Sequence, residues 1–345
     1  MSENLKKLAI IAIIVIAVTI TPIVYLQLTI LSYEKTLIIF HAGSLTGYVE
    51  DLSEIMEKNY PGLEVLNEPS GSVDVIRKVI DLKKPVDIMM VADYRLIPDL
   101  MFSSGKAKWV LVFAANEIVI AFTDKSKYAN EINTENWLEI LMRPDVRFGF
   151  SDPNKDPCGY RAILVLGLAS LYYKTQEPLE VLKESADVKY STDQGKIIFD
   201  VSEGIFPDSV RIFTRDKSVD LIALLEAGII DYAFEYKNVA VSKGLKFVKL
   251  PKEINLGDPS CSDWYSKVSI KILATGDVMK TIEGAFISYG LTIPVEPQHP
   301  TIARKFVELL LSDGGRSTLE KNGFKSLSKP IILGSAPDWL KELVK

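Results

Sequence analysis

The fold is decided by residues 37–91, which read LIIFHAGSLTGYVEDLSEIMEKNYPGLEVLNEPSGSVDVIRKVIDLKKPVDIMMV. Short apolar runs at 37–40, 63–66 and 86–91 have the composition of buried strands. Between them, apolar residues recur at helical spacing near 48–58 and 73–82. Alternation of strands and amphipathic helices predicts an α/β fold with mainly parallel strands flanked by helices.

The rest of the chain continues this rhythm over a length that favours two domains. The 345 residues, of which 48% are hydrophobic, are sufficient for two separate cores. An extended stretch at 109–123 is long enough to cross from one lobe to another, and residues 187–205 have the character of a β insertion. We expect lobe 1 to comprise residues 36–117 plus 246–345 and lobe 2 residues 118–245. Hinges are expected near 113–116 and 243–249.

The N-terminus predicts attachment to a membrane. Lys6 and Lys7 precede an uncharged apolar run at residues 8–32. This run is longer than the core of a signal peptide, which is usually about 7–15 residues, and it reaches the roughly 20 needed to span a bilayer. We therefore expect residues 1–35 to form an anchor or signal segment. The positive end remains inside, which places everything that follows outside the cytoplasm.

Charge and cysteine content exclude several classes of function. The chain has 40 basic and 45 acidic residues, intermixed, with a formal net charge of -5. This balance argues against nucleic acid as a partner, so an anionic ligand would have to be bound by local donors. Cys158 and Cys261 do not show the paired spacing of a zinc site.

Two corners between a strand and a helix are suited to bind an anion. Residues 42–45 (AGSL) and 69–72 (PSGS) each combine glycine with serine directly before a helix. The N-terminus of a helix has unpaired N–H groups and positive partial charge, glycine permits close approach of the backbone, and serine adds a hydroxyl donor. Each corner on its own is also compatible with ordinary helix capping.

Two further segments lie at comparable positions. Residues 151–161 (SDPNKDPCGYR) connect a predicted strand to a helix, and residues 231–237 (DYAFEYK) end a hydrophobic strand. The first is also compatible with a turn-rich capping loop. In the second, Tyr236 has a phenolic hydroxyl that can donate a hydrogen bond, whereas core packing accounts for Phe234.

Together the runs HAGSL, PSGS, DPCGYR and DYAFEYK resemble the archaeal tungstate/molybdate-binding proteins, over about residues 36–330. The resemblance implies a two-lobed type II periplasmic-binding-protein fold whose lobes close on an oxyanion. It implies no cofactor, a monomeric protein, and delivery of the ligand to the permease of an ABC importer. The ligand-binding residues it implies are Gly43, Ser44, Ser72, Asp156, Pro157, Cys158 and Tyr236.

The resemblance also implies two carboxylates placed against the metal centre of the oxyanion, with Asp156 as the first. A carboxylate repels sulfate or phosphate, whereas tungsten and molybdenum can accept an additional oxygen ligand, so the carboxylate favours the larger anions. The family's second carboxylate corresponds to Ser218 in this chain. Asp216 or Glu235 could replace it, or the anion could stay tetrahedral with Ser218 as a hydrogen-bond donor.

Two alternative functions remain compatible with these residues. The same fold serves many ligands, so sulfate or phosphate is a competing assignment. A hydrolase would require Cys158 as nucleophile and His41 as base. Because a histidine at a strand end more often has a structural role, we expect a binding protein and no enzyme.

Overall fold

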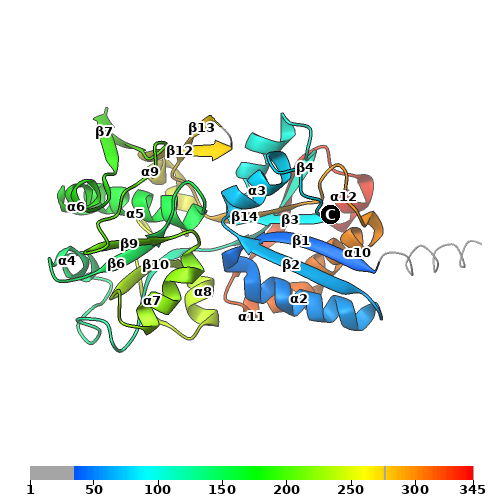
Figure 1. Ribbon diagram of the computed structural model, residues 1–345, viewed down its shortest axis with the longest axis horizontal. Coiled ribbons are helices and arrows are strands. Elements are labelled where there is room, and N and C mark those ends of the chain that lie inside the picture. Colours follow the sequence, from blue (N-terminus) through cyan, green and yellow to red (C-terminus); the bar gives the residue numbers. More distant parts are fainter. Residues whose placement is uncertain (1–34, 276, 345) are drawn as a thin grey trace, which may run out of the picture.

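The computed structural model describes residues 35–275 and 277–344. Figure 1 shows them as two lobes side by side, with the segment from β1 to β4 in one and the segment from β5 to β11 in the other. Residues 1–34 of the expected anchor lie outside the described residues. Within the described ranges, no helix has both the length and the apolar character needed to cross a membrane.

Lobe 1 is built on a six-stranded sheet. Its order is β15 (Lys325–Gly334), β4 (Trp109–Ala115), β14 (Ser288–Thr292), β3 (Ile88–Val91), β1 (Thr36–Ala42) and β2 (Glu64–Ser70). β1 runs parallel to both β2 and β3, with Phe40 opposite Glu68 and Met89. β14 runs antiparallel to β3 and β4, and β15 runs antiparallel to β4.

Lobe 2 contains two sheets. The five-stranded sheet has the order β11 (Lys246–Lys249), β5 (Ile118–Phe122), β10 (Tyr232–Tyr236), β6 (Phe148–Ser151) and β9 (Ile212–Arg215). The four-stranded sheet has the order β13 (Val278–Glu283), β12 (Val268–Thr275), β8 (Lys196–Asp200) and β7 (Lys189–Asp193). The expected β insertion at 187–205 corresponds to the β7–β8 hairpin, which pairs with the later strand β12.

Helices cover the sheets. In lobe 1 they are α2 (Thr46–Asn59), α3 (Ser72–Ile80), α10 (Pro300–Leu311), α11 (Asp313–Lys321) and α12 (Asp338–Leu343). In lobe 2 they are α4 (Trp137–Met142), α5 (Pro157–Tyr173), α6 (Glu177–Ala186), α7 (Ile222–Glu226), α8 (Lys237–Ser242) and α9 (Ser262–Tyr265). Short turns complete the set at η1 (Gly43–Leu45), η2 (Pro98–Phe102), η3 (Ser218–Leu221) and η4 (Pro259–Cys261).

The helical periodicity seen in the sequence corresponds to buried faces. In α3, Val73, Val75, Ile76 and Val79 are buried, whereas Asp74 is partly exposed. α5 instead is buried along most of its length, because it packs against both sheets of lobe 2. A Cβ at Gly167 of α5 would lie 2.8 Å from the Phe199 ring, so this helix and the four-stranded sheet are in direct contact.

Two details differ from expectation. The sheets are mixed rather than mainly parallel, because strands near the crossing between lobes, such as β4, β5 and β14, run antiparallel to their neighbours. The expected boundary between residues 245 and 246 falls inside lobe 2, since β11 pairs with β5 of the five-stranded sheet. The chain returns to the six-stranded sheet only with β14, after the β12–β13 hairpin.

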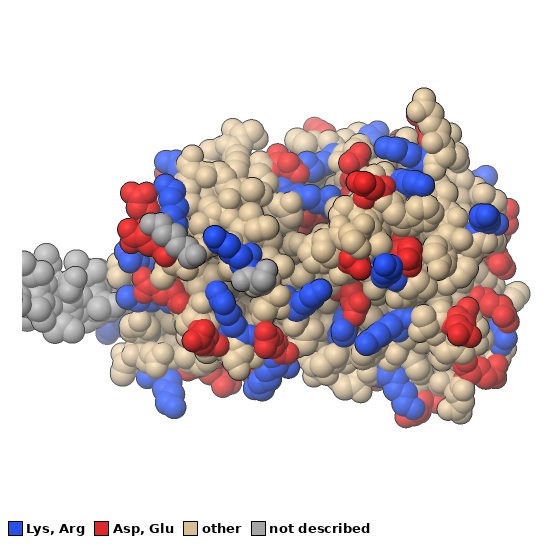
Figure 2. Space-filling view, turned by 180° about the vertical axis from the view of Figure 1, so that it is seen from behind, with Lys and Arg blue, Asp and Glu red and all other residues tan. Residues whose placement is uncertain are grey.

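The surface carries charges of both signs. Figure 2 shows one face of the molecule, on which lysine and arginine side chains are interspersed with aspartate and glutamate. This mixed pattern agrees with the nearly balanced composition and gives that face no broad basic surface of the kind that binds nucleic acid.

Candidate functional site

The residues singled out in the sequence lie where strands of both sheets end. Gly43 and Ser44 follow β1, and Ser72 begins α3 after β2. In lobe 2, Asp156 caps the helix that follows β6, Ser218 opens η3 after β9, and Tyr236 ends β10. These are carboxyl ends of parallel strands, where open α/β sheets bind ligands.

The loops of the two lobes touch one another. The N–H group of Val73 donates to the carbonyl oxygen of Lys155 across the interface at 3.0 Å. A Cβ at Gly71 would lie 2.1 Å from this same oxygen, and a Cβ at Gly43 would lie 3.2 Å from Cγ2 of Val219. Glycine at position 71 is therefore required for the backbones to approach this closely.

Asp156 is a buried carboxylate that organises the loops of lobe 2. Its Oδ1 accepts from the N–H of Cys158 at 3.3 Å, which caps α5 directly before Pro157. Its Oδ2 accepts from the N–H of Ser218 at 2.9 Å. Burial raises the pKa of Asp156, while these two N–H groups act in the opposite direction. The carboxylate thus connects two of the strand-end segments expected at the site.

Glu235 lies behind Ser218 as a second buried carboxyl group. Its Oε2 is 3.1 Å from the hydroxyl of Ser218 and accepts from the N–H of Tyr236 at 2.8 Å. Its Oε1 is buried and has no hydrogen-bond partner among the described residues. Burial raises the pKa of Glu235 to about 8, and the nearby Asp156 acts in the same direction. At neutral pH this carboxyl group is therefore mostly protonated and neutral.

Two serines complete a ring of contacts around the interface. The hydroxyl of Ser72 accepts from the N–H of Ala92 at 2.9 Å. The hydroxyl of Ser44 lies 3.1 Å from that of Tyr289, whose ring meets the Tyr236 ring edge-on at 5.8 Å. The expected ligand-binding residues and Glu235 are buried near this junction, whereas Asp216, the other candidate for the second carboxylate, is exposed and pairs with Lys155 at 2.7 Å.

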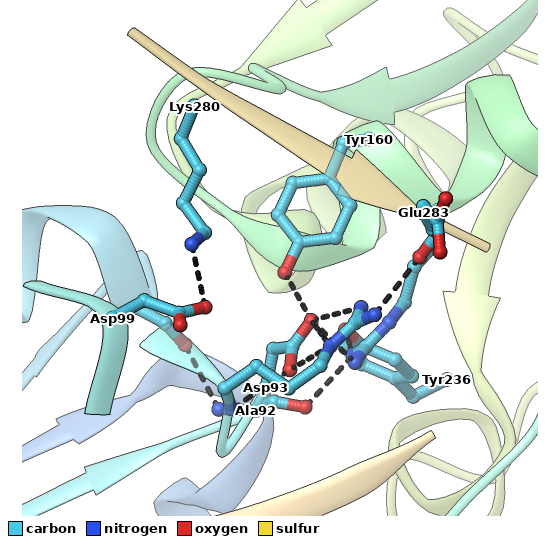
Figure 3. A network of polar contacts seen from close by, with 10 residues as sticks. Ala92, Asp93, Asp99, Tyr160, Tyr236, Lys280 and Glu283 are labelled. Carbon is cyan, nitrogen blue, oxygen red and sulfur yellow. Dashed lines mark hydrogen bonds and ion pairs between the residues drawn. The ribbon is translucent and has the colours of Figure 1, made fainter. Parts of the chain in front are cut away.

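Sequence reasoning did not identify a cluster of ionic groups beside this ring. Arg161 of α5 approaches Asp93 at 3.3 Å, and Arg95 approaches the same carboxylate at 2.7 Å. Tyr160 donates to Asp93 at 2.8 Å, as Figure 3 shows. Burial opposes ionisation of Asp93, but the two arginine charges hold its pKa below the usual value. The signal in the sequence was Arg161 itself, the one charged residue in α5.

The groups needed for a hydrolase are not arranged for catalysis. The Nδ1 of His41 lies 2.9 Å from the carbonyl oxygen of Ala42, and its Nε2 has no hydrogen-bond partner among the described residues. Burial lowers the pKa of His41 to about 4. The thiol of Cys158 instead contacts the carbonyl oxygen of Phe234 at 3.6 Å, and burial raises its pKa. His41 and Cys158 therefore do not form a base–nucleophile pair here.

The described residues contain no cluster of three or more histidine, cysteine, aspartate or glutamate side chains suited to hold a metal ion. What the junction offers is a set of hydroxyl and N–H donors with two carboxyl groups behind them. Such a set can hold an oxyanion by hydrogen bonds.

Comparison with known proteins places the chain among transport proteins. A family profile of bacterial extracellular solute-binding proteins matches residues 37–325. The chain is 46% identical over 318 residues to the molybdate/tungstate-binding protein WtpA of Pyrococcus abyssi, with 90% of each chain covered. It is 44% identical over 312 residues to an uncharacterized solute-binding protein of Staphylothermus marinus, with 89% of this chain and 88% of that one covered.

Among solved structures, the periplasmic molybdate-binding protein of Azotobacter vinelandii matches with a TM-score of 0.55 at 14% identity. The match covers 84% of this chain and 98% of that one. It confirms the expected two-lobed type II periplasmic-binding-protein fold.

Proposed function

Because the chain belongs to the family of bacterial extracellular solute-binding proteins, we propose that it captures molybdate or tungstate and delivers it to the permease of an ABC importer. Membership of this family supports an extracytoplasmic role in transport. The observation that carries the proposal is the convergence of strand-end donors from both lobes on one buried junction.

Lobe 1 supplies uncharged donors to the anion in this proposal. The backbone at Gly43 and the hydroxyls of Ser44 and Ser72 stand at helix or turn beginnings, where N–H groups are available. From lobe 2, Tyr236 adds a phenolic hydroxyl and the segment of Pro157 and Cys158 adds the beginning of α5. These groups would hold any small tetrahedral oxyanion.

Asp156 makes the site selective for large metal oxyanions. Its carboxylate repels sulfate, but a tungsten or molybdenum centre can accept one of its oxygens as a ligand. By the resemblance to the archaeal proteins, Ser218 corresponds to their second carboxylate position, and its hydroxyl lies 3.1 Å from Oε2 of Glu235. We propose that Glu235 is the second carboxyl group of the site and that, being neutral at pH 7, it supports Ser218 without adding a second charge.

Calorimetric titration of the purified protein with tungstate, molybdate, sulfate and phosphate tests the ligand. We expect tungstate and molybdate to bind at least about a hundredfold more tightly than sulfate, a difference of about 2.8 kcal/mol. Equal affinity for sulfate would assign the protein to another oxyanion. Tyr236→Phe should weaken tungstate binding far less than Asp156→Ala does.

We also propose that residues 1–35 hold a monomeric protein at the membrane surface. The support is the uncharged run at 8–32 after Lys6 and Lys7. Full-length protein should sediment with membranes and require detergent for release, and should behave as one chain in light scattering. A mature N-terminus located after residue 32 by mass spectrometry would instead identify a cleaved signal segment.

A further inference from the structure

Arg161 joins the two lobes at the proposed site. Its side chain is only 2% exposed, and its Nη1 donates to Tyr236 Oη at 2.6 Å and to the carbonyl oxygen of Ala92 at 2.7 Å. Tyr236 and Arg161 belong to lobe 2, whereas Ala92 and Asp93 follow β3 in lobe 1. Figure 3 shows Ala92, Asp93, Tyr160 and Tyr236 close together at this junction, with the Tyr160 hydroxyl directed at the Asp93 carboxylate.

The direction of one hydrogen bond follows from the chemistry of arginine. A guanidinium group has only donors, so the oxygen of Tyr236 must accept the bond from Arg161. The phenolic hydrogen of Tyr236 must then point elsewhere, and no acceptor for it is found among the described residues. Tyr236 is fully buried, which makes an unused donor at this position costly without a ligand.

The same residue of lobe 1 orients a second donor. The N–H of Ala92 donates to the hydroxyl oxygen of Ser72 at 2.9 Å, so the hydrogen of Ser72 is also left for another acceptor. The carbonyl oxygen of Ala92 meanwhile fixes Arg161. The backbone of one residue, Ala92, therefore sets one hydroxyl donor directly through its N–H and another through its carbonyl oxygen and Arg161.

Arg161 can make these contacts only when the two lobes are closed on each other. Asp93 of lobe 1 also accepts from Arg95 and from Tyr160 of lobe 2. A buried guanidinium is stable only when it is paired and hydrogen-bonded, and two of the three polar partners of Arg161, Ala92 and Asp93, belong to the opposite lobe. Separation of the lobes removes Ala92 and Asp93 from Arg161 together.

We propose that Arg161 is a positioning residue which, when the lobes close, directs the phenolic hydrogen of Tyr236 onto the bound oxyanion. The inference rests on the proposed function, since it assumes an oxyanion at this junction. It also defines the ligand further. Tyr236 and Ser72 would both present hydrogens, so they favour an anion whose oxygens are all acceptors over hydrogen phosphate, which carries a proton.

A double-mutant cycle between Arg161 and Tyr236 tests the proposal, with tungstate affinity measured by calorimetry. We expect Tyr236→Phe to weaken binding about tenfold and Arg161→Met about a hundredfold. The double variant should bind no more weakly than Arg161→Met, because the phenolic hydrogen is no longer directed once Arg161 is absent. Arg161→Met should also reduce the preference for tungstate over hydrogen phosphate, which a purely structural loss would leave unchanged.

The proposal would be overturned if the loss of binding free energy in the double variant equalled the sum of the losses in the two single variants. If Arg161→Met does not fold by circular dichroism, Arg161→Lys keeps the charge opposite Asp93 and provides the same cycle. The matched control is Asp99→Asn, which removes the more exposed pair with Lys280 of β13, 2.6 Å apart, and should alter affinity less than about twofold. Failure of the wild-type protein to bind tungstate would refute the proposed function instead.

Discussion

Lobe 1 and lobe 2 meet at the same junction with different chemistry. Lobe 1 presents Gly43, Ser44 and Ser72, which carry no charge, whereas lobe 2 presents Asp156 and Glu235, both buried carboxyl groups. Neutral donors attract any oxyanion through the same hydrogen bonds. A charged carboxylate such as that of Asp156 would discriminate, because it repels anions whose central atom cannot accept another oxygen. In the proposed function, lobe 1 would provide general affinity for oxyanions and Asp156 of lobe 2 the selectivity.

The two lobes also depend on each other in different ways. Beside the proposed site, Gly71 and Val73 of lobe 1 contact Lys155 of lobe 2 through their backbone. Arg161 of lobe 2 instead contacts Ala92 of lobe 1 through its side chain. A contact between two backbones leaves almost no room for an added atom. A contact made by a side chain can instead be weakened gradually by conservative substitutions. Substitutions in the two lobes should therefore differ in how much affinity they cost and in whether the loss depends on the anion.

The largest effect is expected from Gly71→Ala in lobe 1. The new Cβ would lie 2.1 Å from the carbonyl oxygen of Lys155, so the lobes could not close as they do here. Overpacking of this kind costs about 3 kcal/mol, which corresponds to a loss of affinity of about a hundredfold or more. Tungstate and sulfate should be affected alike, as measured by calorimetry, and small-angle scattering should show a more open molecule.

Gly314→Ala is the control for this substitution. A Cβ at position 314 would meet its nearest neighbour, Oγ of Ser312, at an ordinary 3.7 Å. This variant should bind tungstate as the wild-type protein does. Tight binding by Gly71→Ala would show that capture does not need the contact with Lys155.

A smaller but selective effect is expected from Asp156→Asn in lobe 2. The amide oxygen can still cap α5 through Cys158, but the amide NH2 group cannot accept from the N–H of Ser218, so the melting temperature should fall by several degrees. Tungstate affinity should fall about thirtyfold, or roughly 2 kcal/mol, because an amide is a poor ligand for the metal centre. Sulfate affinity should remain or rise, since a repulsive charge is removed.

Asp258→Asn is a matched control, because Asp258 caps a short turn in the same way through Ser260. Its effect on the affinity for any of the anions should be negligible. Equal losses for tungstate and sulfate in Asp156→Asn would remove the contrast between the lobes and leave Asp156 only its capping role.

Much of this arrangement was predictable from local pattern. Strand-to-helix corners containing Gly43, Ser72 and Asp156 were identified because turn residues interrupt apolar periodicity there. Parallel strands then bring their carboxyl ends to one edge without any further information. The pairing of β12 with β8, by contrast, joins segments about 70 residues apart in sequence, and the periodicity of a strand does not specify its partner.

The cluster of Arg161, Arg95 and Asp93 could not be predicted, because it also joins segments that are distant in the sequence. Arg161 acquires Ala92 and Asp93 as partners only when two lobes, each folded from its own segments, have come together. Tyr289 reaches Ser44 from a strand more than two hundred residues later. Contacts of this kind depend on how the lobes are placed. A sequence pattern shows only that a lone charge in an apolar helix requires a partner.

The smallest predicted effect is a pH dependence of stability caused by Glu235. It tests whether lobe 2 combines a charged Asp156 with a neutral Glu235. The pKa of Glu235 is about 8 in the folded protein and 4.5 in its ordinary state. Between these values the folded state keeps a proton that the unfolded chain has lost, so the folded state becomes less stable as pH rises. This group alone should lower the free energy of unfolding by about 1 kcal/mol from pH 6 to pH 7 in the ligand-free protein.

Glu235→Gln removes that titration and keeps the hydrogen-bonding shape, so urea denaturation at pH 6 and pH 7 should show a smaller loss of stability than in wild type. The difference between the two proteins cancels the contribution of His41, whose lowered pKa acts in the opposite direction. Asp156 and Asp220 both raise the pKa of Glu235, so Asp156→Asn should reduce the wild-type slope in part. Identical slopes in wild type and Glu235→Gln would mean that Glu235 is ionised, and that lobe 2 presents two charges rather than one.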